Sequence, residues 1–126
     1  MTKKETGEYG ETVAARFLET KGFRITGRNV HSRYGEIDII GENDEYILFV
    51  EAKTRSANRW GTPSEAVHTA KQKKIIKTAL VYLSEHPCAL QPRFDVIEVM
   101  IENGKTGIQW LPNAFDAEIM ANEGTF

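Results

Sequence analysis

Residues 35–54 read GEIDIIGENDEYILFVEAKT, two apolar segments joined by the polar turn ENDE at 42–45. The first segment covers 35–41 and the second 46–54, and both are rich in the isoleucine, valine, phenylalanine and tyrosine side chains that favour strands. A third segment of the same kind, 23–30, precedes them. Because short polar turns separate the three segments, they predict an antiparallel three-stranded meander.

Helical patterns lie on both sides of this meander. Between Glu5 and Lys21, apolar or small residues recur every three or four positions, and Gly22 supplies a helix stop. Residues 62–65 read TPSE, a capping box with proline at the first helical position. This box predicts a second helix that continues to about Glu85.

The remaining chain predicts further strands. Residues 93–102 are almost continuously apolar, as expected for a strand covered on both faces, and 107–111 predict a short last strand. The order is then α-β-β-β-α-β, which predicts a single α/β domain over 1–112 with a mixed central sheet flanked by helices. Residues 113–126 are acidic and weakly patterned, and we expect them to form a weakly structured tail.

Composition narrows the class of protein. The 126 residues are 40% hydrophobic and 27% charged, which is typical of one globular domain rather than a disordered chain. The apolar runs are too short for a transmembrane helix, and the first residues lack the apolar segment of a secretory signal. A single cysteine, Cys88, excludes an intramolecular disulfide. We therefore expect a cytoplasmic protein with no membrane partner.

Acidic side chains interrupt two of the apolar strands. Glu36 and Asp38 share a face of one predicted strand, and Glu51 and Lys53 share a face of the next, because side chains two apart point the same way. Carboxylates among β-branched residues are costly to desolvate, and two that approach each other raise that cost. A divalent cation would relieve it.

Magnesium suits such a pair, since it prefers hard oxygen ligands and usually takes one or two carboxylates. Asp38 and Glu51 are the expected ligands, and the backbone carbonyl of Ala52 is a further candidate. Lys53 is placed to orient an attacking water or to stabilise charge on a phosphorane-like transition state. The chemistry indicated is metal-assisted phosphodiester hydrolysis. The alternative is that Glu51 and Lys53 form an ordinary surface ion pair.

Two helical residues are unusually placed. On a helical wheel Glu11 lies at the edge of the apolar stripe, from which it can reach the sheet. Gln72 begins an otherwise apolar row with Ile76 and Leu80, and its amide can donate to a carboxylate or a phosphate. Each is, in the simpler interpretation, a polar group at the edge of a helix.

Five short motifs occur in order along the chain: GEYGE at 7–11, GEID at 35–38, FVEAKTR at 49–55, KQKK at 71–74 and RFDV at 93–96. Together they resemble the PD-(D/E)XK nuclease superfamily, whose restriction-endonuclease-like core has the same αβββαβ order. More closely, the chain resembles the YraN family of small bacterial proteins, which is related to archaeal Holliday-junction resolvases.

The resemblance implies roles for individual residues. Asp38 and Glu51 would bind Mg²⁺ or Mn²⁺, Lys53 would serve the nucleophile, and Glu11 and Gln72 would complete the site. Alanine stands at 52 where the family usually has valine, which we expect to leave the chemistry intact. The implied activity is that of an endonuclease acting on DNA, including branched or structured DNA.

The stretch from Lys53 to Lys77 holds seven basic residues against the single acid Glu65. Such a stretch is either a solvated helix face or a surface that contacts phosphates beside the scissile bond. Trp60 either packs in the fold or stacks on an unpaired base. The nucleic-acid-binding candidates are Arg55, Arg59, Trp60, Lys71, Lys73, Lys74 and Lys77.

Two other functions compete with the nuclease. One is a nucleic-acid-binding protein of nuclease-like fold with little turnover, acting in a DNA repair, recombination or uptake complex. The other is an interaction module in which the acidic cluster is incidental. By analogy with resolvases, a homodimer would suit an enzyme that cuts two strands.

Overall fold

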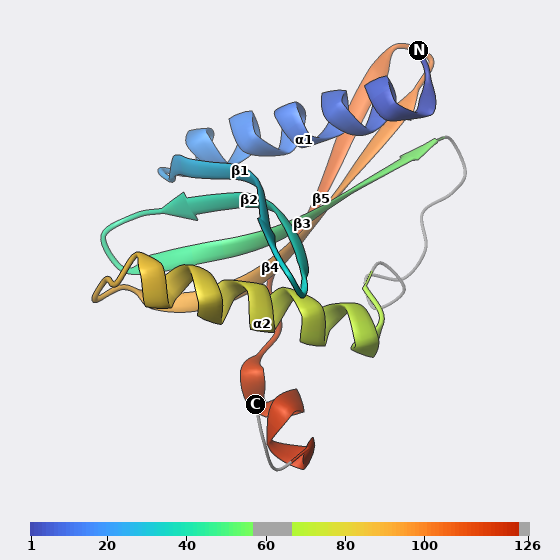
Figure 1. Ribbon diagram of the computed structural model, residues 1–126. Helices are drawn as coiled ribbons and strands as arrows, with labels where there is room; N and C mark the ends of the chain where they lie inside the picture. The colour runs from blue at the N-terminus through green and yellow to red at the C-terminus, as the bar shows by residue number, and fades with distance from the viewer. Residues whose placement is uncertain (57–66, 124–126) are drawn as a thin grey trace.

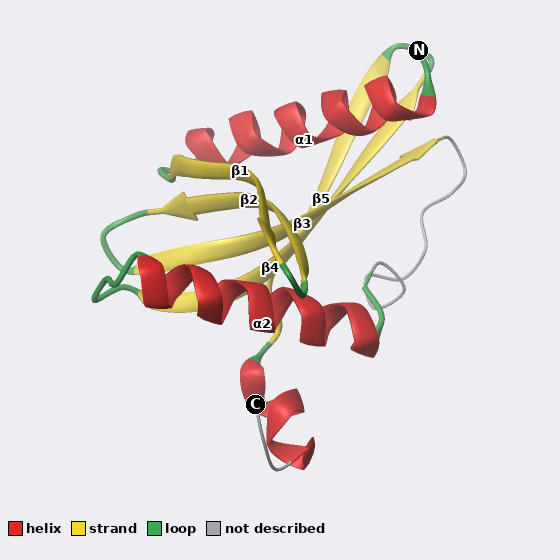
Figure 2. Cartoon of the chain, in the orientation of Figure 1, coloured by secondary structure: helices red, strands yellow, loops and turns green. Residues whose placement is uncertain are grey.

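The computed structural model describes residues 1–56 and 67–123 (Figures 1 and 2). Within them the chain forms two helices, a five-stranded sheet and a short 3₁₀ helix. The elements are α1 Lys3–Thr20, β1 Arg24–Ser32, β2 Gly35–Glu42, β3 Tyr46–Ser56, α2 Thr69–Glu85, β4 Gln91–Glu102, β5 Lys105–Phe115 and η2 Ala117–Glu123. The predicted α/β class with an αβββαβ order is confirmed, and β5 adds a strand at the end.

The sheet is mixed, with strand order β1-β2-β3-β4-β5. The β1–β2, β2–β3 and β4–β5 pairs are antiparallel, which confirms the predicted meander, whereas β3 and β4 are parallel. Parallel neighbours need a crossover connection, and the segment containing α2 provides it. As a result, β3 lies in the centre of the sheet.

The helices cover opposite faces of the sheet (Figure 1). Ala14 and Leu18 of α1 pack with Leu48 and Val50 on one face. Ile75, Ile76 and Ala79 of α2 pack with Phe49, Val96 and other buried residues on the other face. The strand β4 contributes to both clusters, as its continuous apolar run predicts. No helix within the described ranges is long and apolar enough to span a membrane.

Local sequence accounts for the position of α1. Thr2 caps the helix, accepting from the Glu5 amide at 3.1 Å, and the Glu5 carboxylate accepts from the Thr2 amide at 2.9 Å. At its other end Gly22 adopts φ +91°, which favours glycine. In the middle, a side chain at Gly10 would collide with Thr54 of β3, so this glycine permits close packing of helix on sheet.

The second helix begins later than the capping box at 62–65 predicts. That box lies outside the described residues, whereas Val67 and His68 are described and are not helical. His68 is the N-cap, with an extended backbone and no hydrogen bond from its side chain to the helix. The predicted helix start is therefore wrong, because the helix that ends at Glu85 begins after His68. The predicted end is confirmed, because the helix terminates at Glu85 and His86 is its C-cap.

The last strand is longer than the predicted 107–111, because a buried carboxylate anchors its far end. Asp95, at a bulge between β4 and β5, accepts from Trp110 Nε1 and from the Asn113 amide, each at 2.9 Å. It also accepts two hydrogen bonds from Arg93. After this strand comes η2, where Met120 is buried against the α2 side of the core. Long-range contacts thus order residues beyond 112.

Candidate functional site

Asp38 and Glu51 meet across two central strands. The β2–β3 ladder runs from Glu42↔Ile47 to Ile39↔Val50, and Asp38 and Glu51 follow at the end of this register. Both side chains line one pocket of about 360 Å³ between these strands and the start of α2. Glu51 is only 5% exposed, so its carboxyl group is buried there. The pocket is lined by Gly35, Glu36, Asp38, Glu51, His68, Ala70, Lys71, Lys74 and Ile75.

The backbone of β3 holds Asp38 in position. The Ala52 amide donates to Asp38 Oδ2 at 2.9 Å, just beyond the last paired residues of the ladder. Burial and the charge of Glu51 raise the pKa of Asp38 from 3.8 to about 7, although the Ala52 amide and Lys71 oppose this shift. The raised pKa shows that the pocket is short of positive charge when both acids are ionised.

Lys71 supplies part of that charge. Its ammonium group forms an ion pair with Glu51 Oε1 across the gap between α2 and β3. Burial lowers the Lys71 pKa, but the hydrogen bond and charge of Glu51 outweigh this effect and raise it overall. Lys71 therefore stays protonated at neutral pH and compensates one of the two carboxylates.

A second group of polar residues supports the pocket from β1 and α1. With its amide nitrogen turned toward the carboxylates, Asn29 donates to Glu36 Oε1 at 2.9 Å and to Glu11 Oε1 at 3.2 Å. Arg28 lies 3.6 Å from the same Glu11 oxygen. Burial and the nearby charge of Asp38 raise the pKa of Glu11. Glu11, Glu36 and Asp38 therefore form one electrostatically connected group.

Sequence reasoning missed Asn29. The residue adopts φ +51° inside β1, a conformation that asparagine tolerates better than most residues. An asparagine within a strand gives only a weak signal of that kind, and its partners on α1 and β2 cannot be seen from its own position in the sequence.

The donor atoms fit a hard divalent cation. Asp38 and Glu51 supply carboxylate oxygens from adjacent strands. The N–H and C=O of one extended residue point to the same edge, so the Ala52 carbonyl also points toward β2. No group of three His, Cys, Asp or Glu side chains converges within 1–56 and 67–123. Two carboxylates with a carbonyl and waters is the arrangement usual for Mg²⁺.

Comparison with known proteins gives the family. The model described as "Uncharacterised protein family UPF0102" matches residues 10–99, which include every residue of this pocket. The chain belongs to the UPF0102 family. A UPF0102 protein of Syntrophomonas wolfei is 43% identical over 113 residues, covering 89% of this chain and 98% of the relative. One of Myxococcus xanthus is 42% identical over 116 residues, covering 91% and 92%.

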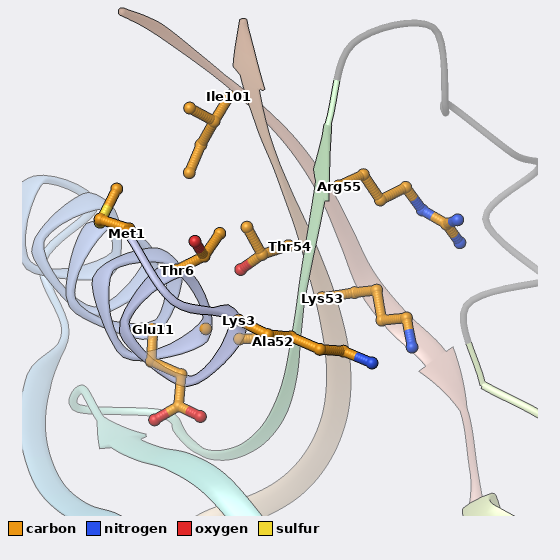
Figure 3. Close-up of a pocket in the computed structure, with 10 residues that line it drawn as sticks. Met1, Lys3, Thr6, Glu11, Ala52, Lys53, Thr54, Arg55 and Ile101 are labelled. Carbon is orange, nitrogen blue, oxygen red and sulfur yellow. The ribbon is translucent and has the colours of Figure 1, made fainter.

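Lys53 lies on the same face of β3 as Glu51, two residues further along, and its side chain is exposed. It is not among the residues that line the carboxylate pocket, and it borders a second hollow, a groove between the end of β3 and α1. Glu11 and Ala52 line that same groove (Figure 3). Ala52 thus connects the two hollows, because its amide contacts Asp38.

Gln72 also lies apart from the Asp38 and Glu51 carboxylates. Its side-chain amide donates to the Val67 carbonyl at 3.1 Å and so ties the start of α2 to the segment before it. Gln72 is not among the residues that line the carboxylate pocket. Gln72 therefore stabilises the start of α2, because its side chain satisfies the Val67 carbonyl.

The basic candidates divide into several groups. Lys71 and Lys74 line the carboxylate pocket, and Lys77 lies over the Tyr34 ring at 5.6 Å from its centroid. Arg55 forms an ion pair with the fully buried Glu98, with Arg55 Nε 3.0 Å from Glu98 Oε1. Lys73 lies on α2 and is half-buried. Arg59 and Trp60 lie outside the described residues.

Two buried acids of β4 differ in how well they are compensated. Asp95 accepts four hydrogen bonds, two from Arg93 and one each from Trp110 and Asn113. Glu98 was not anticipated, because it lies within a continuous apolar run. Its Oε1 pairs with Arg55, whereas its buried Oε2 has no hydrogen-bond partner among residues 1–56 and 67–123. The ion pair with Glu98 therefore holds the Arg55 side chain against β4, near the end of β3.

Proposed function

We propose that this protein hydrolyses phosphodiester bonds in nucleic acid with the help of a divalent cation. The observation that supports this proposal is the convergence of Asp38 and the buried Glu51 in one pocket, with the Ala52 amide fixing the first carboxylate. Two neighbouring acids withdrawn from water cost folding free energy through desolvation and mutual repulsion. A binding function compensates for such a cost.

The cation we propose is Mg²⁺ or Mn²⁺, held by Asp38, Glu51 and the Ala52 carbonyl. When bound, it would polarise a phosphate oxygen and lower the pKa of a bound water. The protein's own contribution is to hold the two carboxylates side by side. The Ala52 amide donates to Asp38 Oδ2, and Lys71 pairs with Glu51 until a cation takes its place.

Lys53 and Glu11 act from the adjoining groove in this proposal. Both line the hollow next to Ala52, with Lys53 on the same face of β3 as Glu51 and Glu11 on α1. Lys53 would stabilise negative charge on the phosphate or orient the attacking water. Glu11, held by Arg28 and Asn29, would bind a water in the outer layer of the cation site.

The rim of the pocket supports nucleic acid as the substrate. Lys71 and Lys74 lie three residues apart on α2, so both point toward the same edge of the pocket, and Lys77 continues this row. Ammonium groups spaced along a helix suit the phosphates of a nucleic-acid strand. Lys73 and Arg55 extend the basic surface, and Arg59 and Trp60 remain candidates.

The resemblance to the PD-(D/E)XK superfamily and to the YraN family makes DNA the proposed substrate, with branched or structured DNA foremost. We place this activity in the cytoplasm, with a homodimer and proteins of repair or recombination as its partners. These assignments rest on analogy with resolvases, while the fold itself has the required αβββαβ order.

One observation favours a second function. The Lys71 ammonium already compensates Glu51, so the pocket reaches partial charge balance without a cation. A protein that binds nucleic acid with little turnover, within a repair, recombination or uptake complex, would show the same arrangement.

Cleavage of end-labelled branched and linear DNA, with Mg²⁺ or Mn²⁺, separates the two functions. We expect the wild type to cut, and Asp38→Ala and Glu51→Ala to bind DNA without cutting it. Asp44→Ala is the matched control, because Asp44 is an exposed acid in the turn between β2 and β3. Equal cutting by all variants would rule out the cation site. Binding without cutting by the wild type would favour the second function.

A further inference from the structure

A second hollow beside the carboxylate pocket is open to a ligand. It has a volume of about 570 Å³ and lies between the first turns of α1 and the end of β3 (Figure 3). Lys3, Thr6 and Gly7 line it from the helix, and Lys53 and Thr54 line it from the strand. We call this hollow the α1–β3 groove.

Positive charge predominates in the α1–β3 groove. Among the described residues, its charged lining residues are the cations Lys3, Lys53 and Arg55 and the acid Glu11. Arg55 is paired with the buried Glu98, so the positive charge of the groove rests on Lys3 and Lys53. In Figure 3 the Lys3 and Lys53 side chains end on one side of the view, and the Glu11 carboxylate points toward the other. Arg28 and Asn29 engage that carboxylate. The open side of the groove is therefore suited to an anion.

Gly7 provides an independent indication of a ligand. A glycine inside a helix lowers helix stability relative to alanine, so its presence needs a reason. For Gly10, one turn later, the reason is packing, since a side chain would strike Thr54. For Gly7, a side chain would meet no atom within 4 Å. Gly7 lines the groove, and its missing side chain leaves the helix backbone accessible there.

The groove and the carboxylate pocket lie on opposite faces of the sheet and meet at the edge of β3 beyond its last pair with β2, Ile39↔Val50. Ala52 lines the groove, while its amide donates to Asp38 in the pocket. Lys53 follows Glu51 by two residues on the same face of the strand. A chain of phosphates that passes over Asp38 and Glu51 and round this edge at Lys53 therefore reaches the groove.

We infer that the α1–β3 groove binds the phosphodiester backbone of a nucleic-acid strand on one side of the reacting phosphate. Lys3 and Lys53 contact phosphate oxygens, and Gly7 lets the strand approach the helix backbone closely. This inference rests on the proposed function, because it names where the same substrate lies. It adds Lys3 and Gly7 as binding residues outside the carboxylate site.

The charge is tested with the pair Lys3→Glu and Lys4→Glu. Both residues lie in the first turn of α1, where a carboxylate favours the helix, so both variants should fold. Lys3 lines the groove, whereas Lys4 does not. Fluorescence anisotropy with a fluorescein-labelled DNA four-way junction, at several salt concentrations, measures binding. Lys3→Glu should weaken binding about tenfold at low salt and reduce the salt-dependence slope by about one, with Lys4→Glu within about twofold of wild type.

The shape is tested with the pair Gly7→Met and Glu8→Met. Both substitutions add the same side chain to adjacent helical positions, and both should leave the thermal transition at or above that of wild type. Gly7→Met fills the groove and should weaken binding about fivefold or more, whereas Glu8→Met, outside the groove, should not weaken it.

The outcomes separate this inference from the proposed function. If both variants of a pair lost binding equally, or neither lost any, the groove would not be a binding site. If the wild type nevertheless cut DNA and Asp38→Ala did not, only the groove inference would fail. If the wild type neither bound nor cut the junction, both proposals would fail.

Discussion

Replacing Asp38 with asparagine should stabilise the folded protein at pH 8. Burial and the charge of Glu51 raise the Asp38 pKa from 3.8 to about 7. Since one pKa unit corresponds to about 1.4 kcal/mol, ionised Asp38 destabilises the fold by on the order of 4 kcal/mol. Asparagine removes the charge and keeps an oxygen that can accept from the Ala52 amide.

The gain in folding stability from Asp38→Asn should shrink as the pH falls. Between pH 3.8 and about 7, folded Asp38 holds a proton that the unfolded chain has lost. The penalty in the wild type is therefore complete above pH 7 and declines as the pH falls toward 3.8. The advantage of Asp38→Asn should be on the order of 4 kcal/mol at pH 8 and about 2 kcal/mol at pH 5.

Urea unfolding, followed by circular dichroism in EDTA, measures these free energies for the two proteins at both pH values. Asp44→Asn is the control, because Asp44 is an exposed acid in the turn after β2 and should change stability little at either pH. If Asp38→Asn were no more stable than wild type at pH 8, or if its advantage did not shrink at pH 5, the repulsion inferred between the two carboxylates would be refuted.

Three further substitutions test other parts of the structure. Gly10→Ala should lower the free energy of unfolding by about 1–3 kcal/mol in urea titrations, because the new methyl group meets Thr54; unchanged stability would contradict the close packing of α1 on β3. Asp95→Asn should cost about 3 kcal/mol in the same assay, because the fully buried Asp95 loses its ion pair with the half-buried Arg93. A loss below about 1 kcal/mol would refute the role of Asp95 as an anchor of β5. Lys71→Met should raise the affinity for Mn²⁺ measured by titration calorimetry, since an ammonium group no longer competes for the carboxylates. The control Lys74→Met should change the affinity less. Weaker Mn²⁺ binding by Lys71→Met would show that the lysine assists the cation.

Much of the fold could be predicted because the signals are local. The period of apolar residues gave α1 and the meander, and the continuous apolar run at 93–102 indicated a strand covered on both faces. The length of β5 could not be predicted, because it depends on Asp95, which is distant in sequence from Asn113. The start of α2 was also misjudged, since residues 67 and 68 are not helical and His68 is the N-cap.

The candidate site could be predicted only in part. Asp38 and Glu51 were expected to approach each other because a short turn fixes the register of their two strands. The contact of Lys71 with Glu51 depends on how the crossover places α2 over the sheet, which no local pattern specifies. Asn29 and Glu98 escaped notice for the same reason, because their partners come from other elements.

Manganese soaked into crystals of the protein at pH 8 offers the most direct test of the cation site. Anomalous scattering locates Mn²⁺ without reference to any activity. We predict one strong peak within bonding distance of the Asp38 and Glu51 carboxylates and the Ala52 carbonyl, with the Lys71 ammonium moved away from Glu51. A peak elsewhere, or an undisturbed ion pair between Lys71 and Glu51 at saturating Mn²⁺, would contradict the proposed site.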